Sequence, residues 1–363
     1  RRPPRSTPKP SSAASDVYKR QTIPSKFYHS SKVYRKLKKI FNRSWQFVGD
    51  TDLLEKNNVH PDILLEGMVD EPYVLTKDGK NIRCLSNVCT HRGTIVCEKA
   101  TKTKNLVCGY HGRQFHIDGK MKFMPEFEDV ENFPSKSDNL PRIEMDLWKK
   151  MIFIINDKKC DISELIGPMI ERLSWLPIEE FKYKPEMSRI YNVKANWALY
   201  CDNYLEGFHI PFVHKDLNQT LEYDEYFTEG IDNTVLQIGI GKDNENTFEL
   251  PKNHQDYGKN VAAYYFFLFP NMMFNFYPWG LSVNVVKPKS PEETQIEYFT
   301  YVWKEELMEK GAGSGLDKVE LEDEEIVESV QKGIKSKAYD RGRYSPRREI
   351  GVHYFHKLIQ KYY

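Results

Sequence analysis

The sequence predicts an α+β protein in two parts, a small all-β domain followed by a larger domain that mixes helices with long strands. A length of 363 residues favours two domains of ordinary size over one. Short β-branched and aromatic runs fill residues 46–156, separated by turn signals such as KDGKN and IDGK. Residues 157–363 instead combine helical patterns with longer strands, as α+β domains do.

The expected elements follow one another in a clear order. Residues 22–45 predict a short basic helical lead-in, and the runs EPYVLT, IRCLSNV, NLVCGY and MIFIIN predict strands of the all-β domain. In the second domain, ISELIGPMIERLSWL predicts a helix, LSVNVV and QIEYFTYVW predict strands, and EDEEIVESVQKGIKS predicts a helix near the end. The chain shows no internal repeat.

The first 21 residues differ in composition from the rest. They are basic, rich in Pro and Ser, and lack a starting Met, which fits either a transit peptide or a disordered tail. Their end, SDVYKRQ, resembles translated sequencing-adapter sequence. We expect residues 1–21 to be a non-native or disordered tail, with the true start of the chain either lost or near Ile23.

Composition excludes several classes of protein. The 53 basic and 52 acidic residues give a formal net charge of +1, so there is no net field to attract nucleic acid or an acidic membrane. Six scattered cysteines are too few for a disulfide scaffold. We therefore expect a reduced, cytoplasmic enzyme that binds neither nucleic acid nor a membrane.

One segment could be mistaken for a membrane span and another for a nicotinamide-binding motif. Residues 261–281 are long and apolar, but two prolines and two asparagines interrupt them, so two buried strands around a turn at Phe269-Pro270-Asn271 fit better than a membrane span. The segment GAGSGL at 311–316 does not lie between a strand and a helix of a β-α-β unit. We interpret it as a flexible loop and expect no nicotinamide site in this chain.

Two short segments combine cysteine with histidine. Cys89-Thr-His91 and Cys108-Gly-Tyr-His111 are separated by sixteen residues. Zinc sites usually take both thiolates of a pair from one knuckle, whereas each segment here supplies one thiolate and one imidazole. A Rieske 2Fe–2S centre requires two thiolates on one iron and two imidazoles on the other. Two such segments can provide this set.

A second constellation lies further along the chain, in NWALYCDNYLEGFHIPFVHKDL. Asp202, Glu206 and His209 are spaced i, i+4 and i+7, so one helix would carry them on one face. Pro211 then bends the chain, which can bring His214 beside His209. Two histidines and a carboxylate with open positions form the facial triad of non-haem Fe(II) oxygenases. The other face of the helix is an apolar stripe of Trp197, Cys201, Tyr204, Leu205 and Phe208.

The pattern CTHRG…CGYHG resembles the Rieske motif of ring-hydroxylating oxygenase α subunits. Respiratory Rieske proteins are similar but carry an extra Cys in each segment for a disulfide; here Gly109 and Tyr110 occupy that region, and Cys97 has no evident mate. The resemblance spans residues 40–360. It implies a Rieske iron–sulfur domain at 46–156 and an α+β helix-grip catalytic domain at 157–363.

The segment Glu206-Gly-Phe-His209-Ile-Pro-Phe-Val-His214 resembles the D/E-x2-H-x4-H motif of the same family. By that resemblance His209 and His214 bind the mononuclear iron. Glu206 would link this iron to the cluster of a neighbouring subunit by hydrogen bonding a cluster histidine, His111 or His91. In much of this family the residue at this position is Asp. A Glu here resembles the sequences of the branch that oxidises quaternary ammonium compounds such as carnitine.

Further site residues are implied by the resemblance. In similar enzymes an Asp eight positions before a helix Gln binds the iron, and counting back from Gln331 gives Asp323, with Glu324 as the alternative. Acidic residues at the start of a helix are also favoured by the helix dipole alone. Asp202 or Asn203 would tune the acidic bridge.

The resemblance implies an oxygenase component that hydroxylates or oxidatively demethylates a small organic substrate with O2. A mononuclear Fe(II) would perform the chemistry and a Rieske 2Fe–2S cluster would feed it. Electrons would come from a separate NAD(P)H-dependent reductase, directly or through a ferredoxin. The family arrangement is a head-to-tail homotrimer, in which one subunit's cluster faces the next subunit's iron.

Alternatives stay open at the level of sequence. The run YYFFLFPNMMFNFYPWG can line a pocket for a flat aromatic ring or, through cation–π contacts, for a quaternary ammonium such as choline, carnitine or a betaine, although most of its rings fit a core. A Rieske electron-transfer protein without catalysis and a zinc-binding interaction module are the alternative functions. His353 and His356, spaced i and i+3, are interpreted as packing or supporting residues because no third ligand accompanies them.

Overall fold

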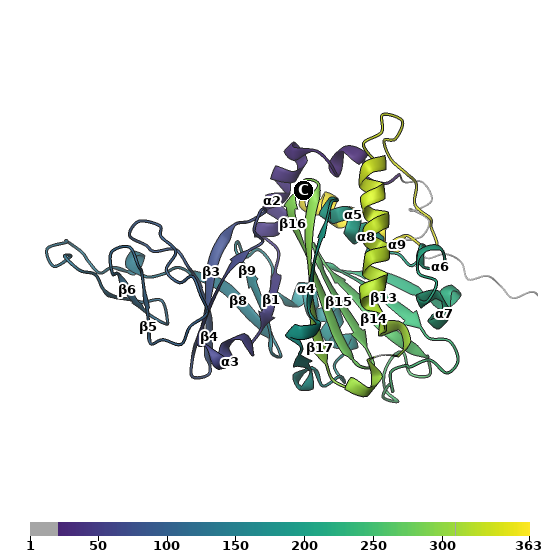
Figure 1. Cartoon of the computed structure of the whole chain (residues 1–363), viewed down its shortest axis with the longest axis horizontal. Helices are drawn as coiled ribbons and strands as arrows, with labels where there is room; N and C mark the ends of the chain where they lie inside the picture. The colour runs from purple at the N-terminus through teal and green to yellow at the C-terminus, as the bar shows by residue number, and fades with distance from the viewer. Residues whose placement is uncertain (1–20, 309) are drawn as a thin grey trace, which may run out of the picture.

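The computed structural model describes residues 21–308 and 310–363, so the tail expected at 1–21 lies outside the described residues except for Gln21. Figure 1 shows a smaller β domain at one end of the longest axis and a larger domain of sheet and helices at the other. Gln21 forms an isolated β-bridge with Arg343, which ties the first described residue to the segment before the last helix.

The helical lead-in packs on the larger domain. A short 3-10 turn, η1 (Ser25–Phe27), precedes α2 (Ser31–Asn42), whose first turn is capped by Ser30 accepting a hydrogen bond from the Val33 amide. The buried face of α2 includes Phe41, whose ring meets Trp197 edge-on at 5.1 Å between centroids. Burial of this apolar face holds the lead-in against the larger domain.

The smaller domain is built from two antiparallel sheets. The six-stranded sheet has the order β1-β9-β8-β4-β3-β2 and the three-stranded sheet the order β5-β6-β7. The strands are β1 (Gln46–Asp50), β2 (Val59–Leu64), β3 (Glu71–Asp78), β4 (Asn81–Ser86), β5 (Asn105–Val107), β6 (Gln114–His116), β7 (Met121–Phe123), β8 (Arg142–Trp148) and β9 (Met151–Ile155), with α3 (Leu53–Lys56) and η2 (Lys136–Asp138) between them. The predicted all-β character of this part is confirmed.

The larger domain contains one antiparallel eight-stranded sheet of order β10-β17-β16-β15-β14-β13-β12, with β11 also paired to β17. The strands are β10 (Lys182–Tyr183), β11 (Arg189–Val193), β12 (Phe227–Ile231), β13 (Thr234–Ile240), β14 (Val261–Leu268), β15 (Met272–Tyr277), β16 (Gly280–Ser290) and β17 (Glu293–Val302). The helices are α4 (Ser163–Arg172), α5 (Trp197–Tyr204), α6 (Ile210–Val213), α7 (Leu217–Thr220), α8 (Leu316–Gly333) and α9 (Ile350–Tyr362). The 3-10 turns are η3 (Ile178–Glu180), η4 (Pro185–Met187), η5 (Tyr223–Glu225), η6 (Glu305–Leu307) and η7 (Gly311–Gly313).

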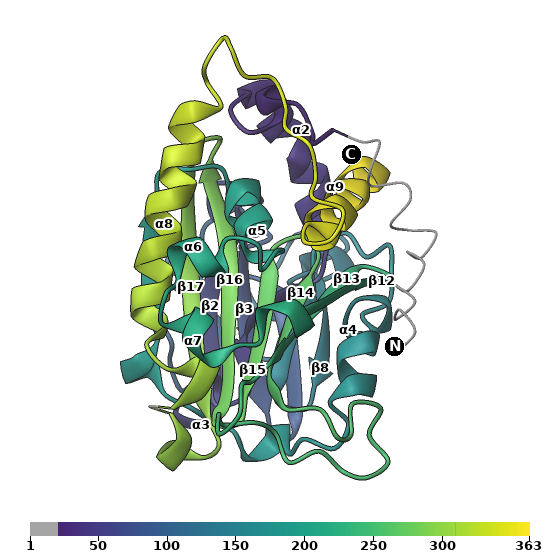
Figure 2. The same ribbon diagram turned by 90° about the vertical axis from the view of Figure 1, so that its right-hand side faces the viewer.

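The eight-stranded sheet is covered on both sides. Figure 2 shows α5, α8 and α9 across its near face, with β2, β3 and β8 of the smaller domain behind it. Because successive side chains of a strand point to opposite faces, each strand places side chains both toward the smaller domain and toward the helices. Alternate residues of β14, β15 and β16 belong to the apolar cluster shared with the smaller domain: Tyr264, Phe266, Leu268, Met272, Phe274, Phe276, Leu281, Val283 and Val285. The intervening residues face the helices.

The apolar stretch at 261–281 forms β14 and β15 on either side of the Phe269-Pro270-Asn271 turn, so the prediction of two buried strands is confirmed. Most of its rings are core residues, as expected, while Tyr265 and Tyr277 line a cavity. Within the part of the chain that the structure describes, each helix is too short or too polar to cross a lipid bilayer.

The segment GAGSGL is a packed turn, where the sequence suggested a flexible loop. Its first half forms η7, and Ala312 is buried beside Ile210 and Leu217. A Cβ at Gly313 would lie 2.2 Å from Nε1 of Trp279, so only glycine allows the backbone this close to the ring. The turn leads directly into α8 and closes one wall of the cavity described below.

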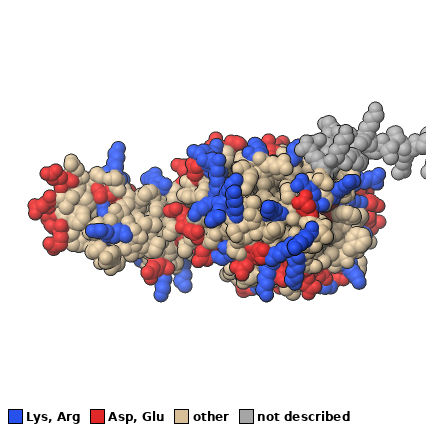
Figure 3. All heavy atoms as spheres, turned by 90° about the horizontal axis from the view of Figure 1, so that it is seen from above, with Lys and Arg blue, Asp and Glu red and all other residues tan. Residues whose placement is uncertain are grey.

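Charged residues of both signs are interspersed over most of the face shown in Figure 3, and Asp and Glu gather at the outer end of the smaller domain. The mixture agrees with the near-zero formal charge of the chain. A surface of this kind favours solubility over a single large electrostatic field.

The packing between the two sheets predicts a large effect of Phe274→Ala. Phe274 is fully buried, stacks on Phe153 at 6.0 Å and meets Phe47 edge-on at 5.7 Å between ring centroids. Its truncation should lower the free energy of unfolding by about 3–5 kcal/mol, measured by urea denaturation. Phe227→Ala, at a ring that is 47% exposed, is the control and should cost less than about 1 kcal/mol. Equal losses would contradict this packing.

Candidate metal centre and active site

Two loops of the smaller domain present Cys89, His91, Cys108 and His111. The two loops share one hydrogen-bonding scheme. In each, the backbone amide of the cysteine donates to the carbonyl of the residue five positions later, and the backbone carbonyl of the cysteine accepts from the amide of the glycine four positions later, Gly93 or Gly112. Both glycines have a positive φ, 76° and 72°, which tightens the turn. The two loops therefore deliver one thiol and one imidazole each in equivalent positions.

The four side chains divide by burial. Both cysteines are buried, whereas His91 is partly exposed and His111 exposed, and the Nδ1 atoms of the two histidines lie 3.2 Å apart. Partial burial and the neighbouring His111 hold the pKa of His91 below its usual range, which favours the neutral imidazole that a metal needs. Two buried thiols and two imidazoles nearer the surface fit a Rieske 2Fe–2S cluster, which the two thiolates and the two histidines would hold.

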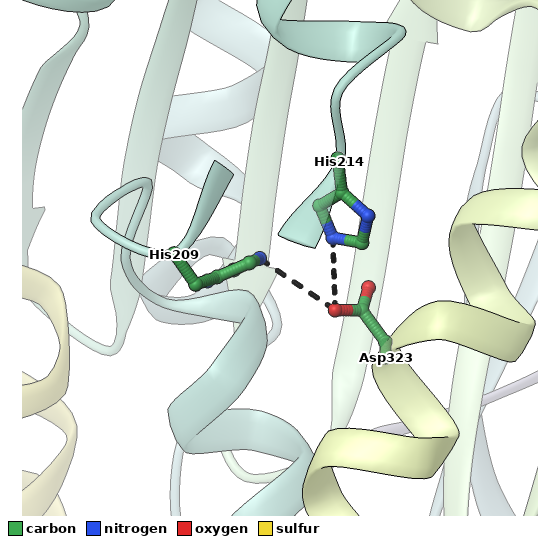
Figure 4. Close-up of side chains that lie close together, drawn as sticks. All are labelled: His209, His214 and Asp323. Carbon is green, nitrogen blue, oxygen red and sulfur yellow. Dashed lines mark hydrogen bonds and ion pairs between the residues drawn. The ribbon is translucent and has the colours of Figure 1, made fainter. Parts of the chain in front are cut away.

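A second group of potential metal ligands lies in the larger domain. His209 and His214 flank α6, and Asp323 lies on α8. Figure 4 shows both rings turned toward the Asp323 carboxylate. Asp323 Oδ1 lies 3.0 Å from His214 Nε2 and 3.6 Å from His209 Nε2, and one ligand atom from each residue falls within 4.8 Å of the others. Two imidazoles and one carboxylate on one side of a cavity fit an Fe(II) with open positions.

Neighbouring acids orient both histidines. Nδ1 of His214 lies 2.8 Å from Glu322, and Nδ1 of His209 lies 2.6 Å from Glu206. Each contact directs the opposite nitrogen, Nε2, toward Asp323. The amide of Asn203 donates to Asp323 Oδ1 at 2.6 Å, which fixes the third group as well.

One local prediction was wrong: a single helix does not carry Asp202, Glu206 and His209 on one face. α5 ends at Tyr204, and residues 206–209 form a turn before α6. The Glu206 carboxylate accepts hydrogen bonds from the amides of Phe208 and His209, which stabilises that turn. Phe208 is consequently exposed, although the sequence placed it on the buried stripe.

Asp202 faces away from the metal group. It accepts a hydrogen bond from Tyr28 at 2.6 Å and lies 2.9 Å from Nε2 of His356. His356 is buried and also contacts Tyr344 at 2.6 Å, and His353 is buried on the same helix, in agreement with packing or supporting roles. Tuning of the bridge by Asp202 stays a prediction; of the two residues suggested, Asn203 contacts the metal group.

The metal group borders a cavity of about 110 Å³ between the inner face of the sheet and α5, α6 and α8. Its wall includes six tyrosines and a set of uncharged polar residues. The tyrosines are Tyr200, Tyr204, Tyr226, Tyr265, Tyr277 and Tyr298, and the polar residues are Gln237, Asn275, Ser282 and Asn284. Sequence reasoning missed most of these residues, although strand alternation would have placed Asn275 and Tyr277 on one face.

Glu320 also lines the cavity and was missed. It lies three residues before Asp323 on α8, so helical spacing puts both on the same face. Its Oε2 accepts hydrogen bonds from the hydroxyls of Tyr200, at 2.6 Å, and Tyr298. Burial, the main cause, raises the pKa of Glu320 to about 8. A cation placed beside it would favour the ionised form.

Family models match both halves of the chain. The model for the ring hydroxylating alpha subunit (catalytic domain) matches residues 173–363, and the model for the Rieske [2Fe-2S] domain matches residues 44–134. The carnitine monooxygenase oxygenase subunit of Escherichia coli K12 is 30% identical over 93% of this chain and 92% of its own. The chloroplastic choline monooxygenase of Spinacia oleracea is 28% identical over 94% of this chain and 78% of its own.

Solved structures show the same architecture. A quaternary ammonium Rieske monooxygenase, described in terms of carnitine oxidation by gut microbiota and inter-subunit electron transfer, superimposes with a TM-score of 0.79 at 26% identity, covering 96% of this chain and 97% of that one. Naphthalene 1,2-dioxygenase from Rhodococcus sp. gives a TM-score of 0.75 at 17% identity, with 96% of each chain covered, which is a likeness of fold alone.

Asp323, and not Glu324, lies in the group with the two histidines, so Asp323 stays the predicted third iron ligand. Asp323→Ala should lower the iron content by about one atom per chain and leave the visible absorption of the cluster unchanged, because the two sites use separate ligands. Iron and acid-labile sulfide assays measure this. Glu324→Ala is the matched control, since Glu324 is outside the group that surrounds the metal position. Loss of iron from Glu324→Ala alone would shift the assignment by one residue.

Proposed function

Because the chain belongs to the family of ring-hydroxylating oxygenase α subunits, with a Rieske 2Fe–2S domain and a catalytic domain that binds a mononuclear iron, we propose that it monooxygenates a small quaternary ammonium compound. One oxygen atom of O2 enters a C–H bond of the substrate and the other leaves as water, with two electrons and two protons consumed. The observation that carries this proposal is the tyrosine-lined cavity beside His209, His214 and Asp323.

The cavity wall suits a permanent cation. Tyr265 meets Tyr277 edge-on at 5.9 Å and stacks on Tyr226 at 6.4 Å between ring centroids, so three rings form a continuous aromatic surface. Such rings attract quaternary ammonium groups through cation–π contacts. The amide and hydroxyl groups of Gln237, Asn275 and Ser282 suit a polar substrate better than the flat hydrocarbon that the sequence left as an alternative.

The residues around the iron position have two different roles, holding the iron and orienting its histidine ligands. Fe(II), when bound, supplies O2 activation and needs open positions beside the substrate. His209, His214 and Asp323 occupy one side of that position and leave the side toward the cavity open. Glu206 and Glu322 hold the two imidazoles in the tautomer that presents Nε2.

Electron supply requires a second subunit. Oxygenases of this family take electrons from a reductase, and we expect an NAD(P)H-dependent one, directly or through a ferredoxin. In Figure 1 the loops around β5 and β6 lie at one end of the molecule and α6 at the other, so one chain cannot bring its own two sites together. The cytoplasmic location expected from the sequence stays a prediction.

Exposed apolar side chains flank both sites and support a head-to-tail homotrimer. Tyr110, beside His111, is 63% exposed, and Phe212, between the two iron-site histidines, is 75% exposed. Apolar surface of this kind is expected at a protein interface. In the proposed ring each subunit's cluster loops meet the next subunit's α6, and Glu206 hydrogen-bonds a cluster histidine across the contact.

Substrate-dependent oxygen uptake tests the function. The protein with both metal sites loaded, NADH and a reductase of this enzyme family should consume O2 when choline or carnitine is present and release one product per O2. His209→Ala should keep the cluster absorption and lose about one iron per chain together with turnover. An iron–sulfur protein that reduces and reoxidises normally yet consumes no O2 with any quaternary ammonium compound would support an electron carrier instead.

The bridge is tested by Glu206→Gln. The variant should retain both metals but slow oxidation of the reduced cluster in a single turnover by about tenfold or more, because the amide cannot take up the proton that accompanies electron transfer. Rapid-mixing absorption spectroscopy follows the cluster. Glu225→Gln, at an exposed position of η5, is the control. Cluster oxidation at the wild-type rate in Glu206→Gln would reject the bridge.

A further inference from the structure

Glu320 is a buried carboxylate to which the iron chemistry assigns no role. It lines the active-site cavity and is only 4% exposed. The hydroxyls of Tyr200 and Tyr298 satisfy Oε2, whereas Oε1 has no hydrogen-bond partner among the residues that the structure describes. A buried carboxylate oxygen without a partner destabilises the protein unless a ligand supplies one. The free oxygen therefore points to a ligand, and a ligand of positive charge would favour the ionised form of a carboxyl whose pKa burial otherwise raises.

The charges around the cavity lead to the same conclusion. Its described lining contains the carboxylates of Glu206, Glu320 and Asp323 and neither lysine nor arginine. The two positive charges of a bound Fe(II) would be more than offset by Asp323, Glu206 and Glu322, which lie against the histidines. Glu320 is left without a counter-charge from the protein or the metal.

We propose that Glu320 is the counter-ion of the substrate's quaternary ammonium group, and that the cavity selects cations without an acid group over zwitterions that carry one. The inference rests on the proposed function and narrows its substrate class to quaternary ammonium alcohols. Tyr200 and Tyr298 hold the carboxylate in place through Oε2 and leave Oε1 for the cation. The surrounding tyrosine rings cover the methyl groups.

The uncharged polar residues of the cavity wall support the choice of an alcohol. Gln237 is fully buried, and its Oε1 has no hydrogen-bond partner within the described part of the chain. An acceptor of this kind can receive a hydroxyl proton from the substrate. A carboxylate at the same place would add a negative charge to a cavity that already holds three acids and lacks a basic side chain.

Three ligands of similar shape separate the effects of the cationic group and of a carboxylate on binding. Choline carries the cation and the hydroxyl, 3,3-dimethylbutan-1-ol is its neutral isostere, and glycine betaine carries the cation with a carboxylate. Titration calorimetry on the anaerobic, iron-loaded enzyme should give choline an affinity at least about tenfold above that of the other two, as expected for a desolvated charge pair.

Glu320→Gln removes the charge and retains acceptors for the two tyrosines. It should weaken choline binding by about tenfold or more and leave binding of the neutral isostere unchanged. Glu325→Gln, exposed on the same helix, should bind all three ligands as the wild type does. A misfolded variant would lose both choline and the isostere, and Glu320→Asp, which keeps the charge, should then recover choline binding in part.

The outcomes separate this inference from the proposed function. Equal loss of choline and isostere by a folded Glu320→Gln variant overturns the counter-ion role. Glycine betaine bound as tightly as choline by the wild type overturns the selection against acids. In both cases oxygen uptake with quaternary ammonium compounds still supports the function. Absence of uptake and of binding with every quaternary ammonium compound rejects both.

Discussion

The double coverage of the eight-stranded sheet is the constraint on which the rest of the structure depends. Strand geometry sends alternate side chains to opposite faces, and both faces are buried, one against the smaller domain and one beneath the helices. The face toward the smaller domain is a dry aromatic layer that includes Phe274. The face toward the helices carries Gln237, Asn275 and Ser282 at buried positions. Buried polar side chains such as these need hydrogen-bond partners, either in the protein or on a ligand.

The position of α8 against α5 turns that polar face into a catalytic site. Gln331 accepts a hydrogen bond from the Asn196 amide at 2.9 Å, and one end of the helix pair is thereby fixed. The other end is fixed by Asn203, which donates to Asp323. Residues 323–331 of α8 thus lie alongside residues 196–203, a register that brings Asp323 to the histidines and Glu320 to the tyrosines. Burial of these polar contacts makes any slip of the helix costly.

The two metal sites differ in what the protein must provide. The Rieske loops keep their thiols inside and their imidazoles at the surface, which suits a cluster that exchanges electrons with partners. The candidate iron ligands lie deeper, with His214 only 2% exposed, which suits chemistry that must limit the access of water. In Figure 1 the loops around β5 and β6 and helix α6 lie at opposite ends of the molecule, so the proposed ring would bring together two sites that a single chain keeps apart.

The sequence by itself determined the two-domain α+β organisation, the pairing of Cys89-Thr-His91 with Cys108-Gly-Tyr-His111 and the spacing of His209 and His214, because ligand types and short spacings are local properties. The sequence was misleading at residues 205–209. Its residue spacing there continues the helical period, but the chain forms a turn that Glu206 stabilises. Only the tertiary structure brought Asp323 beside the histidines and showed that Glu320 and six tyrosines share their cavity. These contacts join segments more than a hundred residues apart, and long-range packing, which local pattern does not encode, decides them.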